Sequence, residues 1–291
     1  MRRSEITAEL AAALVADQFP AWAHLPVTPV AVGGNDNRTF RLGSTMLVRL
    51  PSHAAYVAQV EKEQAWLPWL APKLPCPIPA PLAFGRPSGI YPHPWSVYSW
   101  LPGQSANIMP PGDKVRFAAD LANFLHALRS IAPEGPPAGP HSHNRGGDLW
   151  AFDEQTRAAI ATLGGRIRQA LASRLWDAAL AAPFAGPPVW VHGDIAPGNL
   201  LVEGGRLSAV IDFGCCAVGD PACDLVMAWT YFDGDARASF QYGPDLDDAA
   251  WARGRGWALW KALIILAAPA GDDGPQGETA RTTLIALGVM N

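Results

Sequence analysis

Residues 189–224, VWVHGDIAPGNLLVEGGRLSAVIDFGCCAVGDPACD, are the stretch that decides the fold. An apolar run ends at His192-Gly193-Asp194, and Asn199 follows Asp194 by five residues. The runs 200–202 and 207–211 are predicted strands. The turn Glu203-Gly204-Gly205-Arg206 between them is typical of a β-hairpin, since paired glycines adopt the positive φ angles that such a turn needs.

This hairpin brings two polar loops together, because it returns the chain from the Asp194 loop to Ile211-Asp212-Phe213-Gly214. Asp212 follows Asp194 by 18 residues. Phosphoryl transfer uses one carboxylate to orient a hydroxyl, and an Asn with an Asp to hold metal ions on the phosphates. A plain hairpin with polar turns and a capping Asp is the alternative, but it leaves the order and the spacing of these residues unexplained.

The ordered set, Asp-x4-Asn followed by Asp-Phe-Gly, resembles the catalytic and metal-binding loops of kinases. The His-Gly-Asp opening and the trailing Gly219-Asp220-Pro221-x-x-Asp224-Leu225 are similar to the aminoglycoside phosphotransferase family. The resemblance extends over nearly the whole chain and is weakest in 103–188 and at the C-terminus. It implies a protein-kinase-like α+β fold of two lobes, with a small β-rich N-lobe and a larger helical C-lobe. It also implies ATP or GTP and Mg²⁺ as cofactors.

Composition narrows the class of protein. The chain has 291 residues, of which 49% are hydrophobic and 16% charged, which is typical of a globular protein. A net charge of −4 gives no reason to expect nucleic acid as a partner. No apolar run approaches the roughly 18 residues of a membrane span, and acidic residues in 4–19 argue against a signal peptide. The four cysteines contain no C-x-x-C pair, which favours a reducing cytoplasm over disulfides or structural zinc. The oligomeric state stays open.

Periodicity divides the chain at Pro102-Gly103 into an N-terminal nucleotide-binding lobe, 1–102, and a C-terminal catalytic and substrate-binding lobe, 103–291. A helix capped by Thr7 is predicted first, and Pro68 should end or kink the last turn of a second helix. The predicted strands are 27–32, 39–42, 46–50 and 95–101, with short edge strands in 74–94. The predicted helices are 56–70, 114–131, 153–182, 225–232, 251–268 and 279–290.

The resemblance assigns the nucleotide phosphates to Arg49, which stands where the family usually has Lys. Arg49 should contact the α/β-phosphates and pair with Glu63, with Glu61 as the competing partner. The alternative is a surface Arg on an edge strand. Gly33 and Gly34 are the candidate phosphate loop, but they lack the G-x-G-x-x-G pattern and fit an ordinary strand connection equally well.

The resemblance places the purine base beside Ser99, Trp100 and Leu101, with Tyr98 at the gatekeeper position behind it. In some relatives a bulky gatekeeper goes with a preference for GTP, so the choice between ATP and GTP stays open. Trp100 could equally belong to the core.

In the catalytic loop, Asp194 should accept a hydrogen bond from the acceptor hydroxyl and take its proton late. Asn199 and Asp212 are the predicted Mg²⁺ ligands. His192 should brace the loop and Asp220 should cap it or tie it down. Asp224 is a candidate cap for the helix 225–232.

The acceptor is a small-molecule hydroxyl that no clean motif identifies. Asp233 and Asp235 are candidate contacts for a polycationic aminosugar, whereas Asp245, Asp247 and Asp248 are better explained as caps of the helix that starts near Ala249. The first hypothesis is therefore a cytoplasmic kinase of an aminoglycoside-like antibiotic. The alternatives are a metabolic kinase with an amino-alcohol or fructosamine-type acceptor, and a pseudokinase that binds without turnover.

Overall fold

The computed structural model describes residues 2–30, 36–242, 246–269 and 274–290. By their internal contacts these residues form two compact units. The first unit contains Met1–Gly103 and Ser208–Gly214, and the second contains Gln104–Leu207 and Cys215–Asn291. The chain thus enters the first unit twice, whereas the sequence analysis had assigned 208–214 to the second part. The second passage is held in the first unit by the Val210 N–H, which donates to the Pro77 carbonyl at 3.1 Å.

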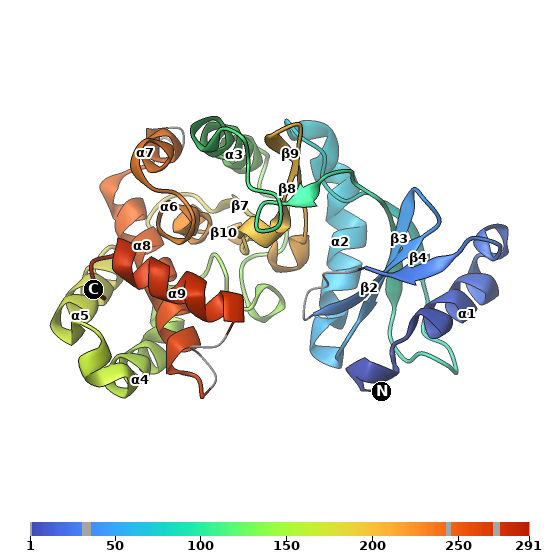
Figure 1. The fold of residues 1–291 in the computed structure, drawn as a ribbon, viewed down its shortest axis with the longest axis horizontal. Coiled ribbons are helices and arrows are strands. Elements are labelled where there is room, and N and C mark those ends of the chain that lie inside the picture. Colours follow the sequence, from blue (N-terminus) through green and yellow to red (C-terminus); the bar gives the residue numbers. More distant parts are fainter. Residues whose placement is uncertain (1, 31–35, 243–245, 270–273, 291) are drawn as a thin grey trace. The chain divides into compact units, whose positions relative to one another are not determined.

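The first unit is built on an antiparallel sheet of five strands in the order β1-β2-β3-β5-β4. Strands β2, β3 and β4 of this sheet are labelled in Figure 1. The strands are β1 Val27–Pro29, β2 Asn37–Leu42, β3 Met46–Pro51, β4 Pro81–Gly85 and β5 Trp95–Ser99. Strand β4, which begins with Pro81, lies at the edge of the sheet, where a missing N–H costs no ladder hydrogen bond. The strand predicted to reach Leu101 ends at Ser99.

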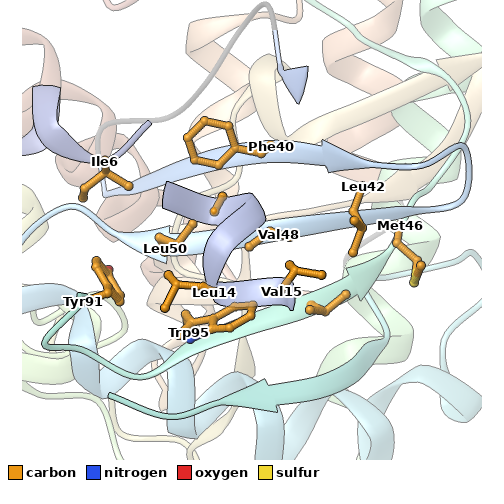
Figure 2. Packing of buried hydrophobic residues seen from close by; sticks show 12 residues of the cluster. Ile6, Leu14, Val15, Phe40, Leu42, Met46, Val48, Leu50, Tyr91 and Trp95 are labelled. Carbon is orange, nitrogen blue, oxygen red and sulfur yellow. The ribbon is translucent and has the colours of Figure 1, made fainter. Parts of the chain in front are cut away.

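Helix α1, Ala8–Gln18, supplies the apolar cover for one part of this sheet. Thr7 caps it as predicted, because its Oγ1 accepts the Leu10 N–H at 3.3 Å. Figure 2 shows Leu14 and Val15 of α1 against Phe40, Val48 and Trp95, all of them almost completely buried. This cluster fixes β3, which carries Arg49.

Helix α2, Val57–Leu70, packs against β4 and β5. It ends at Leu70, the predicted end of the helix, two residues past Pro68. A proline removes one hydrogen bond, here the one that the Gln64 carbonyl would accept, and so close to the helix end little depends on it. The Gln64 side chain ties α2 to the sheet instead, since its Nε2 donates to Ser96 Oγ at 2.8 Å.

The second unit is mainly helical and is organised around α8, which packs against α4, α5 and α9. Its helices are α3 Lys114–Arg129, α4 Asp153–Leu163, α5 Gln169–Leu180, α6 Met227–Thr230, α7 Gly234–Tyr242, α8 Asp248–Ala267 and α9 Gly274–Ala286. The stretch predicted as one helical region, 153–182, is divided at Gly164, whose φ of +51° ends α4. None of the helices in the described ranges is long and apolar enough to cross a membrane.

Short strands carry the loops of the candidate site. Strand β7, Val189–Val191, pairs with β10, Ala217–Gly219, and β6, Gln104–Ser105, pairs with β8, Leu200–Glu203. Strand β9, Arg206–Val210, leaves the second unit and ends in the first. The turn between β8 and β9 contains Gly204 at φ +58° and Gly205 at φ +79°, as the paired glycines predict.

Candidate active site

In the second unit, β7 ends at Val191, and His192-Gly193-Asp194 follow it directly. Gly193 has a φ of +80°, and a Cβ there would lie 2.6 Å from the Cys215 carbonyl oxygen. Only glycine therefore fits this position, which turns the chain sharply out of β7 and places Asp194 in the loop.

Asp224 holds this turn from a distance in the sequence. Its Oδ2 accepts the His192 N–H and its Oδ1 the Gly193 N–H, each at 2.8 Å. Burial raises the pKa of Asp224, although the charge of His192 and these hydrogen bonds oppose the rise. Asp224 is thus an anchor of the Asp194 loop, which differs from the helix cap that the sequence indicated.

Asp220 caps the 3₁₀ turn Pro221–Val226, which contains Asp224, because its Oδ1 accepts the Ala222 N–H at 3.0 Å. The same carboxylate makes a two-pronged ion pair with Arg253 of α8, at 2.7 and 3.1 Å. The side chain of Arg253 is only 8% exposed and that of Asp220 only 5%. A buried pair of this geometry therefore fixes the turn on α8. His192 is fully buried, and its Nδ1 accepts the Asp194 N–H at 3.2 Å.

Asp194 faces a cation that the sequence analysis missed. Lys261 Nζ of α8 lies 3.0 Å from Asp194 Oδ1, and about a third of each side chain is exposed (39% for Lys261, 34% for Asp194). Burial acts to raise the pKa of Asp194, but the charge and hydrogen bond of Lys261, with Arg145 and His192, hold it below its usual value. The one available signal was that Lys261 is the single charged residue in the otherwise apolar stretch 256–269.

Asn199 is fixed by the same carboxylate. Its Nδ2 donates to the Asp194 carbonyl at 2.9 Å and to Asp194 Oδ2 at 3.3 Å. With the nitrogen directed at two acceptor oxygens, the amide oxygen is the atom that remains for a ligand. Amide oxygens are among the ligands that Mg²⁺ accepts, so Asn199 fits the ion.

In the first unit, Arg49 of β3 joins two carboxylates. Its Nη1 donates to Glu63 Oε1 at 3.2 Å, and its Nη2 donates to Asp212 Oδ1 at 2.8 Å. Burial acts to lower the pKa of Arg49, but Glu63 and Asp212 raise it further than burial lowers it. Glu61 is exposed whereas Glu63 is 5% exposed, so Glu63 is the partner.

Asp212 has an unusual backbone, with a φ of +67° at the end of β9. Left-handed conformations are rare for residues with side chains, and they concentrate at functional sites. The loop after Asp212 is held by α2, because buried Lys62 donates to the Gly214 carbonyl at 2.7 Å. The Asp212 side chain is 35% exposed, and a carboxylate has a second oxygen, so it can ligate a cation while it pairs with Arg49.

Tyr98 of β5 is 1% exposed, and its hydroxyl donates to Glu63 Oε2. Burial, followed by the charge of Glu63, raises its pKa well above the usual value. Tyr98 therefore belongs to the Arg49–Glu63 cluster, a contact that the sequence did not predict.

The segment after β5 is already hydrogen-bonded to its own unit. The Ser99 N–H donates to the Ala80 carbonyl at 3.0 Å, and the Trp100 N–H to the Thr45 carbonyl at 2.8 Å. Trp100 is half-buried, with the Arg41 guanidinium 3.7 Å from its ring centroid, so it is not a core residue. Leu101 follows, also half-buried. Gly33 and Gly34 lie outside the described residues.

The predicted acceptor carboxylates have their own local roles. Asp233 is 80% exposed and lies 3.4 Å from Lys114 Nζ, and Asp235 is exposed in the first turn of α7. Asp247 caps α8, since its Oδ1 accepts the Ala250 N–H at 2.8 Å. Asp245 lies outside the described residues.

Residues 27–260 match the model of the phosphotransferase enzyme family. The chain belongs to this family. The stretch matched includes Arg49, Glu63, Asp194, Asn199 and Asp212.

Solved structures of other phosphotransferases share the fold of this chain. An aminoglycoside 2″-phosphotransferase in complex with GDP and kanamycin matches with a TM-score of 0.72 at 20% identity, over 96% of this chain and 97% of the other. Wild-type aminoglycoside 2′-phosphotransferase-IIIa with GDP matches with a TM-score of 0.71 at 18% identity, over 97% and 99%. A macrolide 2′-phosphotransferase from Brachybacterium faecium matches with a TM-score of 0.60 at 23% identity, over 95% and 97%.

These findings confirm the family and the kinase-like α+β fold that the loop motifs indicated. The chain is accordingly a phosphotransferase, with an antiparallel sheet in its first unit and a helical second unit.

Proposed function

We propose that this phosphotransferase moves the γ-phosphoryl group of ATP or GTP to a hydroxyl of a small molecule, with Asp194 as the residue that orients the hydroxyl. The observation that carries the proposal is the environment of Asp194: Lys261 pairs with its carboxylate, and Asn199 donates to its carbonyl and carboxylate oxygens. A carboxylate held in this way accepts a hydrogen bond from a hydroxyl and takes its proton late in the transfer, which contributes about 10²–10⁴ in rate.

Bound nucleotides in the similar solved structures support the choice of cofactor. Their descriptions name GDP, ADP and ATP. In this chain, Arg49 is the candidate contact for the α/β-phosphates, and Glu63 holds its guanidinium in place. The arginine guanidinium donates to Glu63 and Asp212 from two separate nitrogens. A lysine has a single ammonium nitrogen and bridges two carboxylates less well.

Asp212 in the first unit and Asn199 in the second are the proposed Mg²⁺ ligands. The ion would neutralise charge on the phosphate oxygens during transfer. Each residue keeps an oxygen for it, as the hydrogen bonds of Asn199 and the left-handed turn at Asp212 support.

For the base, we propose the carbonyls of Ser99 and Trp100, whose N–H groups are used within the unit, together with the Leu101 backbone. Tyr98 remains the proposed gatekeeper, and the backbone of Gly33 and Gly34 remains the proposed phosphate cradle.

Two acceptor hypotheses remain: an aminoglycoside-like antibiotic, and a metabolic amino-alcohol or fructosamine-type sugar. Membership of the phosphotransferase family speaks against the third hypothesis, binding without turnover. Solved relatives described with kanamycin, streptomycin or gentamicin favour a small-molecule acceptor. Asp233 and Asp235 remain proposed acceptor contacts of the first hypothesis, and a cytoplasmic location remains a proposal.

The test is Asp194→Asn, assayed by nucleotide consumption across aminoglycosides, macrolides, amino alcohols, sugar amines and hydroxy acids. We expect unchanged folding and nucleotide binding, and a fall in kcat of at least about 10². The matched control is Asp120→Asn, which removes a carboxylate paired with exposed Arg206 in the same unit. A mutant that keeps its kcat where chemistry limits turnover would show that another group orients the acceptor.

A further inference from the structure

Two cations act on Asp194, the residue proposed to orient the hydroxyl: Lys261 and Arg145. Lys261 Nζ is hydrogen-bonded to Asp194 Oδ1 at 3.0 Å. The stem of Arg145 packs on the turn before Asp194, since a Cβ at Gly193 would lie 3.0 Å from the Arg145 Cβ. A hydroxyl hydrogen-bonded to Asp194 Oδ1 therefore lies within about 6 Å of an ammonium, because each hydrogen bond spans about 3 Å.

Aromatic rings cover one side of this basic pair. The Arg145 guanidinium lies 4.3 Å from the ring centroid of Trp260 and 5.6 Å from that of Trp257, both on α8. Among the residues that the structure describes, no carboxylate forms an ion pair with Arg145. Asp194 is an acidic neighbour of Arg145, since the charge of Arg145 helps to lower the Asp194 pKa. A guanidinium stacked on an aromatic surface, with no carboxylate hydrogen-bonded to it in the described part of the chain, suits an anionic group.

The nearby carboxylates do not offset this charge. Asp220 is paired with Arg253, and Asp224 is bonded to two backbone N–H groups. Both side chains are at most 5% exposed, so neither can contact an acceptor. Of these carboxylates, only Asp194 offsets the charges of Lys261 and Arg145. Two positive charges and one negative charge leave one positive charge in excess.

We propose that Lys261 and Arg145 select the acceptor of this phosphotransferase, and that it is a hydroxyl compound with a carboxylate or similar anionic group close to the reacting hydroxyl. This inference rests on the proposed function. The acceptor anion takes the Lys261 ammonium from Asp194, which frees Oδ1 for the hydroxyl. The hydroxyl oxygen then bonds to the γ-phosphorus, the bond to the bridging oxygen breaks with its electrons on the nucleoside diphosphate, and the hydroxyl proton goes to Asp194. A polycationic aminosugar meets like charges here.

The experiment compares a hydroxybutyrate, its amide, the corresponding aminobutanol and kanamycin as acceptors, by kcat/KM and by calorimetric binding with a non-hydrolysable nucleotide present. The variants are Lys261→Gln and Lys261→Arg. Lys73→Gln is the matched control, because it removes the same charge from a lysine that contacts only Trp69 among its described interactions.

We expect the wild type to favour the carboxylate over the amine by at least about 10-fold, since attraction becomes repulsion when the sign of the charge changes. Lys261→Gln should remove most of that preference, Lys261→Arg should keep it, and Lys73→Gln should leave it unchanged. A wild type that favours aminobutanol or kanamycin overturns the inference, as does a Lys261→Gln variant that slows all acceptors by one factor.

The outcomes separate the two proposals. Kanamycin phosphorylation that requires Asp194 would uphold the proposed function and refute the anionic acceptor. Absence of transfer to every acceptor, with no nucleotide binding, would refute the proposed function. Calorimetry tests the preference for an anionic acceptor without turnover. Binding of the hydroxybutyrate that Lys261→Gln abolishes supports the inference, and no binding of the hydroxybutyrate overturns it.

Discussion

Arg253→Met should strongly destabilise the second unit, because it leaves a carboxylate buried without its partner. Arg253 donates three hydrogen bonds, two to Asp220 at 2.7 and 3.1 Å and one to the Ala182 carbonyl at 3.1 Å. Bonds of this kind contribute about 1–3 kcal/mol each, and part of the sum is offset because the guanidinium no longer has to be desolvated. Breaking a buried pair on one side accordingly costs about 3–5 kcal/mol of unfolding free energy.

The assay is thermal melting followed by tryptophan fluorescence, with Arg206→Met as the control. Arg206 makes the same two-pronged contact with Asp120, at 2.7 and 3.1 Å, but its side chain is 54% exposed. The exposed pair should be worth at most about 1 kcal/mol. We therefore expect Arg253→Met to lower Tm by about 6–20 °C and Arg206→Met by at most about 4 °C.

Adding Asp220→Asn to Arg253→Met should recover part of the loss, because the uncompensated charge is then removed. Equal melting temperatures for the two single arginine variants would refute the reasoning, since burial would then not determine the value of the pair. A double variant no more stable than Arg253→Met would refute the buried charge as the cause.

Three further outcomes are expected. Asp212→Ala should abolish turnover, with excess EDTA producing the same loss in the wild type; full activity in either case would exclude a metal-binding Asp212. Tyr98→Ala should raise kcat/KM for ATP relative to GTP by at most about 10–200-fold, at a cost of about 3–5 kcal/mol in stability, whereas Tyr98→Phe should lose only the contact with Glu63; an unchanged nucleotide ratio with a lowered Tm would leave Tyr98 as a packing residue. The lowered pKa of Asp194 means that its ionised form adds stability above the unfolded value near 3.8, and that this stability is lost as pH falls through the folded pKa. The difference in Tm between wild type and Lys261→Gln should therefore be present at neutral pH and vanish in acid, and a difference that persists in acid would contradict the pairing.

Local chemistry explains what the sequence could predict. The glycine pair at 204–205 specifies its hairpin by itself, because few other residues accept two consecutive positive φ angles. Thr7 likewise specifies the start of α1 through a hydrogen bond three residues away. The spacing of Asp194, Asn199 and Asp212 depends on such short-range elements, which is why the motif could be read directly from the chain.

The missed contacts depend on tertiary structure. Lys261 is 67 residues from Asp194, and a lysine in an apolar helix carries no sign of its partner. Asp224 occupies a position where a helix cap is expected. Its carboxylate instead accepts two backbone N–H groups in the sharp turn after β7, where no strand pairs with them. Local rules assign such residues to local partners, and only the packed chain shows that distant backbone groups compete for them.

The double passage of the chain through the first unit limits how this enzyme can be divided. A fragment that ends at Gly103 contains Arg49 and Glu63 but lacks Asp212, the second carboxylate of that cluster. Its complement would carry Val210 without the Pro77 carbonyl to which its N–H donates, and the loop at Gly214 without Lys62, which holds it. Split-protein reporters or chimaeras that exchange the N-terminal part at a single junction should therefore fail, and a functional exchange needs a second insert that carries 208–214.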